Sequence, residues 1–207
     1  MYYVVACLLG YIFGCIHGSQ FVGKLKGVNI KEAGVKNAGA SNTTILLGWK
    51  YGIIVAFIDI FKATAAILLL LILLQENAVP TQEQHIYIYL TALFVIIGHN
   101  YPITMHFSGG KGTASLVGAL IAIDWRIALI GIGILIIFTI ATDYLAIGVL
   151  CMYISFLITT YYFFGLAPFL IVIGLSVLGI YKHIENYKRI KGKEETKLSS
   201  MFGKKAS

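Results

Sequence analysis

Residues 51–74 read YGIIVAFIDIFKATAAILLLLILL, an apolar run that contains only two charged side chains, Asp59 and Lys62. About 20 such residues in a helix cross the roughly 30 Å hydrocarbon core of a bilayer. Residues 113–142 are long enough for one tilted helix, but Asp124, Trp125 and Arg126 interrupt them and favour two shorter helices. The other runs that reach or approach a membrane-spanning length are Tyr2–Val22, Ile86–Gly98, Tyr144–Phe164 and Ala167–Tyr181. The sequence therefore predicts an all-α integral membrane protein with about seven transmembrane helices, some of them short.

The composition agrees with this fold class. Of the 207 residues, 58% are hydrophobic and 12% are charged, whereas soluble domains have about 45–50% and about 25%. The first apolar run lacks a basic start and a small-residue cleavage site, so we expect a retained helix and not a signal peptide. We expect one membrane domain over residues 1–192, followed by a basic cytoplasmic tail over residues 193–207.

The distribution of basic residues predicts the orientation, because lysine and arginine collect in cytoplasmic loops. With the N-terminus outside, fifteen of the sixteen basic residues lie on or near the cytoplasmic side, and only Arg126 lies outside. We therefore expect an N-out, C-in topology. The three cysteines, Cys7, Cys15 and Cys151, lie in apolar runs at no metal-like spacing. We expect no metal, and no nucleic-acid partner because no binding motif is present.

Two glycine-rich loops on the predicted cytoplasmic face carry polar groups. Residues 34–42, GVKNAGASN, combine small residues that let a ligand approach the backbone with the hydrogen-bonding side chains of Asn37, Ser41 and Asn42. Residues 98–112 begin with Gly-His-Asn-Tyr-Pro and end with Gly109, Gly110, Lys111 and Gly112. Consecutive glycine amides and a lysine suit an anion, although a nucleotide-binding P-loop would need another glycine and a Ser or Thr.

Several ionisable residues allow more than one interpretation. Asp59 and Lys62 share a helix face, where they form either a structural ion pair or part of a polar pocket. His99 is a proton acceptor, a phosphate donor or an interfacial histidine. His183, Asn186 and Arg189 share a face at three-residue spacing, either in a binding site or on a basic helix against anionic lipid.

These segments, in this order along nearly the whole chain, resemble the bacterial membrane glycerol-3-phosphate acyltransferases that use acyl phosphate (the PlsY family). Residues 37–42, NAGASN, resemble the family's Gly-Asn-x-Gly-Ala-Thr-Asn, and residues 59–62, DIFK, resemble its Asp-x-x-Lys-Gly. Residues 99–102, HNYP, with 107–112, FSGGKG, resemble its most specific signature, His-Asn-Tyr/Phe-Pro followed by Phe-x-Gly-Gly-Lys-Gly. His183, Asn186, Arg189 and residues 192–194, GKE, are similar to its C-terminal His-Arg-x-Asn-Ile-x-Arg and Gly-Thr-Glu.

The resemblance implies transfer of a fatty acyl group from acyl phosphate to the sn-1 hydroxyl of glycerol 3-phosphate, which yields lysophosphatidic acid and phosphate without a cofactor. This is the first step of phospholipid synthesis, and it places the chain in the bacterial cytoplasmic membrane, linked in function to an enzyme that forms acyl phosphate. We expect Asn37, Ser41, His99 and Lys111 to be catalytic, with Lys111 and the Gly109–Gly112 amides on phosphate. The expected substrate-binding residues are Gly39, Asn42, Asp59, Lys62, Asn100, Gly109, Gly110, Gly112, His183, Asn186 and Arg189.

The chain departs from the family pattern at several positions. Val35 and Lys36 replace Ser-Gly, Ile45 replaces an arginine, His17 replaces a proline, and Asp143 begins a segment that reads Arg-Tyr-x-Ser in the family. If Asp143 faced phosphate it would repel it, and replacing it by arginine would raise activity. A substrate-altered enzyme, a non-catalytic relative that binds lipid phosphate and a small-molecule transporter therefore remain alternatives.

Overall fold

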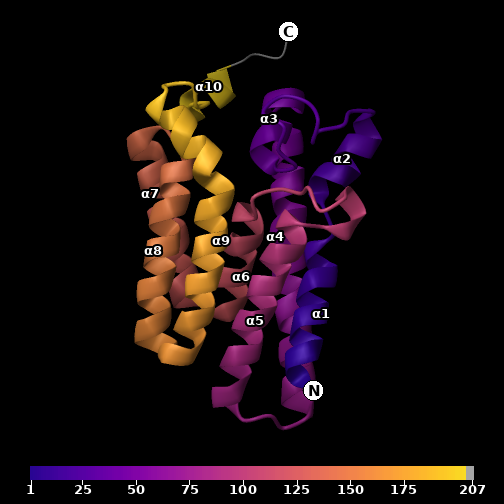
Figure 1. Cartoon of the computed structure of the whole chain (residues 1–207), viewed down its shortest axis with the longest axis vertical. Helices are drawn as coiled ribbons and strands as arrows, with labels where there is room; N and C mark the ends of the chain where they lie inside the picture. The colour runs from indigo at the N-terminus through magenta and orange to yellow at the C-terminus, as the bar shows by residue number, and fades with distance from the viewer. Residues whose placement is uncertain (204–207) are drawn as a thin grey trace.

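The computed structural model describes residues 1–203, and all of the regular secondary structure in this part of the chain is helical (Figure 1). Its helices are α1 Tyr2–Gly14, α2 Gly18–Lys26, α3 Ala40–Leu47, α4 Trp49–Glu76, α5 Thr81–Asn100, α6 Thr113–Ile123, α7 Trp125–Thr142, α8 Leu145–Phe164, α9 Leu166–Lys191 and α10 Leu198–Gly203, with a 3-10 turn at Ile103–Met105. Six described segments are long and apolar enough to cross a membrane: α1 with α2, α4, α5 with the 3-10 turn, α7, α8 and α9. The predicted tail continues past residue 203, and its last four residues lie outside the described part.

Residues 113–142 form two helices, as the charged interruption predicts. Asp124 adopts an extended conformation between α6 and α7, and its side chain accepts a hydrogen bond from the Arg126 backbone N–H at 2.8 Å. α6 therefore has only 11 residues. At 1.5 Å per residue it covers about 16 Å, roughly half of a hydrocarbon core.

The helices form two groups with the short α6 between them (Figure 1). One group contains α1, α4 and α5, and the other contains α7, α8 and α9. Helices α2, α3 and α10 lie together at the end of the molecule opposite the N-terminus. Since the predicted loops also converge at that end, the two groups enclose a site there.

Close backbone contact between α1 and α5 depends on glycine, and Gly10, Gly14 and Gly18 repeat at every fourth residue. A Cβ added to Gly14 would lie 2.4 Å from the Val95 carbonyl oxygen and 2.8 Å from the Gly98 Cα. Gly98 in turn meets the Tyr11 carbonyl. Gly18 begins α2 and contacts Val55 of α4 instead. The stripe thus packs α1 on α5 and α2 on α4, through small residues as in other membrane helix pairs.

A buried aromatic cluster joins the second group of helices to α5. The rings of Tyr89 on α5 and Phe156 on α8 stack at 5.8 Å. Tyr153 on α8 lies so close to Gly179 on α9 that a side chain there would overlap its ring. Such close packing sets the spacing between α5 and α9, which carry His99 and His183.

Candidate active site

A cavity of about 290 Å³ lies between the two groups of helices. Polar residues from six parts of the chain line it: Asn37, Ser41, Asp59, His99, Lys111, Thr113, His183, Asn186, Arg189, Glu195 and Thr196. Apolar residues line it as well, among them Val35, Ile45, Ile60, Val117, Leu135, Leu145 and Met201. We call the first set, which includes the cations Lys111 and Arg189, the cationic wall and the second set the apolar wall.

Asn42 shapes the first glycine-rich loop from inside. It is fully buried, and its side-chain N–H group donates to the carbonyls of Ile30 at 2.7 Å, Ala33 at 2.9 Å and Asn37 at 3.0 Å. Its carbonyl oxygen accepts the Val35 amide at 3.0 Å. Its side-chain N–H group is used entirely within the loop. Asn42 therefore holds the loop and does not line the cavity, contrary to our expectation that it binds substrate. Gly39 and Ser41, at the start of α3, do line it.

The Asp59–Lys62 pair is buried and anchors α1 and α5. The Lys62 ammonium lies 3.2 Å from Asp59 Oδ1 and donates to the carbonyls of Gly14, at 2.9 Å, and Ile16. It also lies 2.8 Å from His99 Nδ1. Asp59 borders the cavity, whereas Lys62 does not. Both interpretations of the pair therefore apply: Asp59 and Lys62 form a structural ion pair, and Asp59 is also part of the wall of a polar cavity.

His17, Asp59 and His99 bring three metal-ligating atoms within 4.8 Å of one another. The Lys62 ammonium already lies within hydrogen-bonding distance of two of them, so a cation of the protein itself balances the Asp59 charge. His17 stacks on His99 at 4.5 Å, and its ring nitrogens have no hydrogen-bond partner among the described residues. We assign this group to packing around the ion pair.

The glycines of the second loop are required by packing, and this corrects one expectation. The Gly109 amide donates to the Asn100 carbonyl and the Gly110 amide to the His99 carbonyl, each at 3.1 Å. These two amides are therefore not free to bind phosphate. A Cβ on Gly109 would lie 2.1 Å from the His99 carbonyl oxygen, and one on Gly110 would lie 2.2 Å from His99 Nε2. The two glycines thus fold the loop back against His99.

Lys111 and Gly112 are the members of this loop that line the main cavity. Their backbone amides form no hydrogen bond within residues 1–203. Gly112 adopts a left-handed conformation, with φ of 82°, immediately before α6. Asn100 is fully buried behind it, and its side chain makes no hydrogen bond in the described part of the chain. Asn100 therefore lies outside the cavity that it was expected to line.

Lys111 belongs to a chain of polar contacts with α9 and the C-terminal segment. Its ammonium donates to Asn186 Oδ1. The Asn186 side-chain N–H donates to Glu195 Oε1 at 2.6 Å, and Arg189 Nε donates to Glu195 Oε2 at 2.6 Å. The pKa of Lys111 is lowered to about 8, chiefly by burial and then by the Arg189 cation, whereas the Glu195 carboxylate opposes the shift. The site thus concentrates positive charge where the cavity is polar.

His183 is buried beside this chain. Its Nδ1 donates to the Gly179 carbonyl at 2.8 Å, which leaves the Nε2 lone pair 3.5 Å from the Thr113 hydroxyl. Glu195 and Thr113 were not predicted from the sequence. The sequence contains one indication of a role for Glu195. It is an acidic residue in a basic tail, and it follows Gly192, where the helix is expected to end, so the tail could fold back onto the helix.

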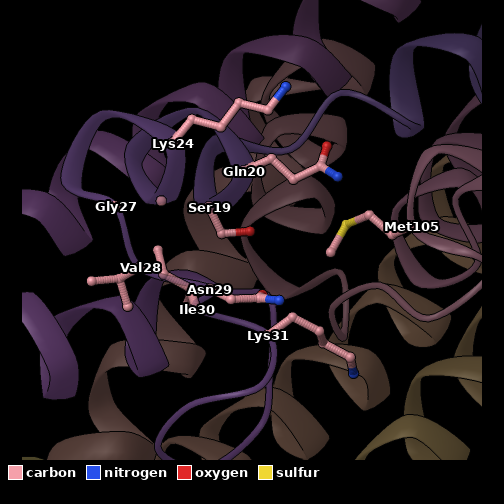
Figure 2. Close-up of a pocket in the computed structure, with 10 residues that line it drawn as sticks. Ser19, Gln20, Lys24, Gly27, Val28, Asn29, Ile30, Lys31 and Met105 are labelled. Carbon is pink, nitrogen blue, oxygen red and sulfur yellow. The ribbon is translucent and has the colours of Figure 1, made fainter.

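Two further cavities flank the site. A cleft of about 510 Å³ is lined by Lys31, Lys36, Lys182 and Lys188 and shares Lys111 with the main cavity. Gly109 and Gly110 line this cleft as well. The other, of about 300 Å³, lies beside α2, where Lys24 and Gln20 face Met105 across it (Figure 2). None of the residues predicted for the site lines this second cavity.

The departures from the family pattern have different surroundings. Val35 and Ile45 line the main cavity, and Lys36 lines the basic cleft. Asp143 lines none of these cavities, and its carboxylate accepts two hydrogen bonds from Ser199. Asp143 therefore does not face the cavity or the basic cleft, which is the condition on which the predicted repulsion of phosphate and gain from arginine depend.

Comparison with known proteins gives one consistent result. A family profile described as "Glycerol-3-phosphate acyltransferase" matches residues 4–193. The chain is 90% identical, over the full length of both, to glycerol-3-phosphate acyltransferase 1 of Oceanobacillus iheyensis, and 30% identical to the glycerol-3-phosphate acyltransferase of Thermosipho melanesiensis, covering 99% and 98% of the two chains. Crystal structures of PlsY (YgiH), an integral membrane glycerol 3-phosphate acyltransferase, are similar in fold. The glycerol 3-phosphate form superposes with a TM-score of 0.84 at 27% identity, covering 97% of this chain and 98% of that one, and the lysophosphatidic acid form with 0.82 at 26%, covering 98% and 99%.

Proposed function

We propose, since this chain belongs to the glycerol-3-phosphate acyltransferase family, that its cavity transfers a fatty acyl group from acyl phosphate to the sn-1 hydroxyl of glycerol 3-phosphate. The hydroxyl oxygen forms a bond to the acyl carbon, and the bond between that carbon and the phosphate oxygen breaks. Lysophosphatidic acid and inorganic phosphate are the products. The observation that carries the proposal is a single cavity with a cationic wall and an apolar wall, because the two substrates differ in the same way.

The cationic wall suits the phosphate groups. Lys111 and Arg189 lie on either side of Asn186 and Glu195, and Lys182 and Lys31 lie close enough to lower the Lys111 pKa. Like charges held together in this way repel one another, so a bound phosphate dianion relieves their repulsion. A charge-assisted contact to phosphate contributes about 1.5–3 kcal/mol. We assign the acceptor phosphate to this wall, with His183 and Asn186 beside it.

The apolar wall suits the acyl chain. Ile45 comes from α3, Ile60 from α4, Leu135 from α7 and Leu145 from α8. Asn37, Ser41 and the start of α3 line the same cavity. Helix N-termini and amide donors stabilise negative charge, so we assign them, with the free amides of Lys111 and Gly112, to the oxyanion and the leaving phosphate.

The contacts of His99 argue against a role as a general base. The Lys62 ammonium is a donor, so His99 Nδ1 accepts from it. The neutral ring then carries its proton on Nε2 and has no free lone pair. We assign His99 as a donor that steadies a substrate oxygen, and the departing phosphate as the acceptor of the hydroxyl proton.

The site faces the cytoplasm in this proposal, in an N-out, C-in protein of the bacterial cell membrane. Lysines surround the cavity and its flanking clefts, as cytoplasmic ends of membrane proteins require. Acyl phosphate is an activated anhydride, so the reaction needs a partner enzyme that forms it.

The test is the formation of lysophosphatidic acid by purified protein from acyl phosphate and labelled glycerol 3-phosphate. Lys111→Ala is expected to lower turnover by at least about 100-fold, the effect of removing one charge-stabilising group. Lys24→Ala is the matched control, because Lys24 lines only the cavity beside α2. Turnover by Lys111→Ala close to that of the parent protein would remove Lys111 from the site. No product from the folded parent protein would favour an altered substrate.

A further inference from the structure

The segment after α9 folds back and forms part of the cavity wall. α9 ends at Lys191, and Lys193 turns the chain with φ of 60°. The backbone amides of Glu194 and Glu195 both donate to the Arg189 carbonyl, at 2.8 and 3.3 Å. Glu195, Thr196 and Met201 then line the cavity. The cavity is therefore completed by residues that lie beyond the last membrane helix.

Asp143, which lies between α7 and α8, also holds the segment that follows α9. It forms the turn between α7 and α8 with φ of 64°. Its backbone carbonyl accepts the Leu198 amide at 2.9 Å, its Oδ1 accepts the Ser199 amide at 2.8 Å, and its Oδ2 accepts the Ser199 hydroxyl at 2.7 Å. A carboxylate at the first turn of a helix accepts amides that otherwise lack partners. α10 is thus capped by a residue 56 positions earlier in the chain.

The same contacts keep Asp143 ionised. Hydrogen bonds from Ser199, first from its amide and then from its hydroxyl, lower the pKa of the Asp143 carboxyl. The charged groups that face it from the C-terminal segment include Lys197, which acts in the same direction. Asp143 is therefore an anion whose hydrogen bonds go to the tail and not to the cavity.

The tail passes this restraint to the acceptor end of the site. Glu195 lies between the bend at Gly192 and the cap at Ser199, and it binds Asn186 and Arg189 at 2.6 Å each. Asn186 in turn accepts a hydrogen bond from Lys111. Two anchors hold the segment, Glu195 on α9 and Ser199 on Asp143. Loss of the Ser199 contacts leaves only the Leu198 amide, bonded to the Asp143 backbone carbonyl, to hold that end of the segment.

We propose that Asp143 is a positioning residue for the acyl transfer: through Ser199 and α10 it fixes Glu195, and through Glu195 it orients Asn186 and Lys111 toward the acceptor phosphate. The inference rests on the proposed function. The expected effect of Asp143 on acceptor binding is then opposite to the effect expected from its charge alone. A carboxylate that repelled phosphate would weaken acceptor binding, whereas a carboxylate that positions the site strengthens it.

The experiment compares Asp143→Ala and Asp143→Asn with the parent enzyme over a range of glycerol 3-phosphate concentrations. Asp143→Ala is expected to raise KM for glycerol 3-phosphate by up to about tenfold, because losing a helix cap destabilises the segment that holds Glu195, with a smaller change in kcat. Asp143→Asn keeps an oxygen for the Ser199 amide and is expected to recover most of the loss. Asp124→Ala is the matched control, because Asp124 caps α7 in the same way, by accepting the Arg126 amide, and does not line the cavity.

A double-mutant cycle and a proteolysis assay separate positioning from general damage. Ser199→Ala and Asp143→Ala together are expected to raise KM no more than Asp143→Ala alone. The Ser199 hydroxyl acts through its bond to the Asp143 carboxylate, and that bond is already lost in Asp143→Ala. Trypsin is expected to cut after Lys197 faster in Asp143→Ala than in Asp124→Ala. An unchanged or lower KM in folded Asp143→Ala overturns the inference while the parent enzyme remains active. An inactive parent enzyme instead overturns the proposed function.

Discussion

Lys111 is surrounded by other cations and bound by one amide oxygen, Asn186 Oδ1. An isolated lysine on a protein surface has a pKa near 10.4, whereas burial and Arg189 lower that of Lys111 to about 8. The side chain is therefore mostly charged at neutral pH and loses its charge within the range in which enzymes are assayed. A phosphate dianion beside it restores the charged form, so acceptor binding and proton uptake are coupled.

This coupling predicts a pH dependence. Below about pH 8 Lys111 carries its proton in the free enzyme, and above it the ammonium is lost, so kcat/KM for glycerol 3-phosphate is expected to fall as the pH rises through about 8. Lys111→Arg is expected to move this fall to a higher pH, since arginine stays charged. Initial rates from pH 6 to pH 10 measure both profiles. A parent profile that is flat across pH 8 would contradict the assignment.

The contact between α1 and α5 is the element that connects packing to the site. The Gly14 carbonyl at the end of α1 and the Ile16 carbonyl just after it accept hydrogen bonds from the Lys62 ammonium, which also donates to His99 Nδ1 on α5. These bonds require α1 to lie against α5 at a distance that only glycine allows, at Gly14 and Gly98. A larger residue in this contact is expected to disturb Lys62 as well as the helix pair.

Gly14→Ala tests this contact. Its methyl group would lie 2.4 Å from the Val95 carbonyl oxygen, so α1 must move. We expect the free energy of unfolding to fall by about 1–3 kcal/mol, the usual cost of overpacking, measured by thermal unfolding in detergent. Gly133→Ala on α7 is the control, because nothing lies within 4 Å of its added methyl group. Equal melting temperatures for the two variants would show that the α1–α5 contact tolerates a side chain.

At the scale of the whole molecule, some features could be predicted from local sequence, whereas others depend on contacts that form only in the folded chain. The apolar runs and the break at Asp124 predict the helices, because hydrophobic length and a capping residue are local signals. Most predicted site residues line the cavity, because the loop motifs lie beside helix ends and the other motifs lie on the faces of α4 and α9. Their order along the chain and their spacing on α9 were sufficient to find them.

The remaining features depend on partners that are distant in sequence. Asn42 turns inward because three carbonyls of its own loop accept its amide, and the Gly109 and Gly110 amides are used by the end of α5. Ser199 meets Asp143 across 56 residues, so the charge of Asp143 taken alone suggests the wrong partner. No local pattern contains these pairings.

The predicted N-out, C-in orientation is tested by labelling in a variant whose three cysteines are replaced by alanine. Lys197→Cys and Glu83→Cys place single thiols on exposed positions. Lys197 directly precedes α10 and Glu83 lies in the first turn of α5, and these two segments are at opposite ends of the molecule (Figure 1). A membrane-impermeant maleimide is expected to label Glu83→Cys in intact spheroplasts and Lys197→Cys only after lysis. The reverse pattern would invert the topology and place the site outside the cell.

The 11 residues of α6 have a consequence for the lipid around the enzyme. Because α6 covers about 16 Å and begins beside the cavity, after Gly112, we expect the reacting groups to lie below the plane of the nearer headgroups in a bilayer whose opposite interface meets the far end of α6. Water and charge would then enter the leaflet to meet the acyl donor, and the new lysophospholipid would lift its phosphate to the surface as it leaves. On this reasoning we expect slower turnover in bilayers of longer-chain lipids than in thin ones.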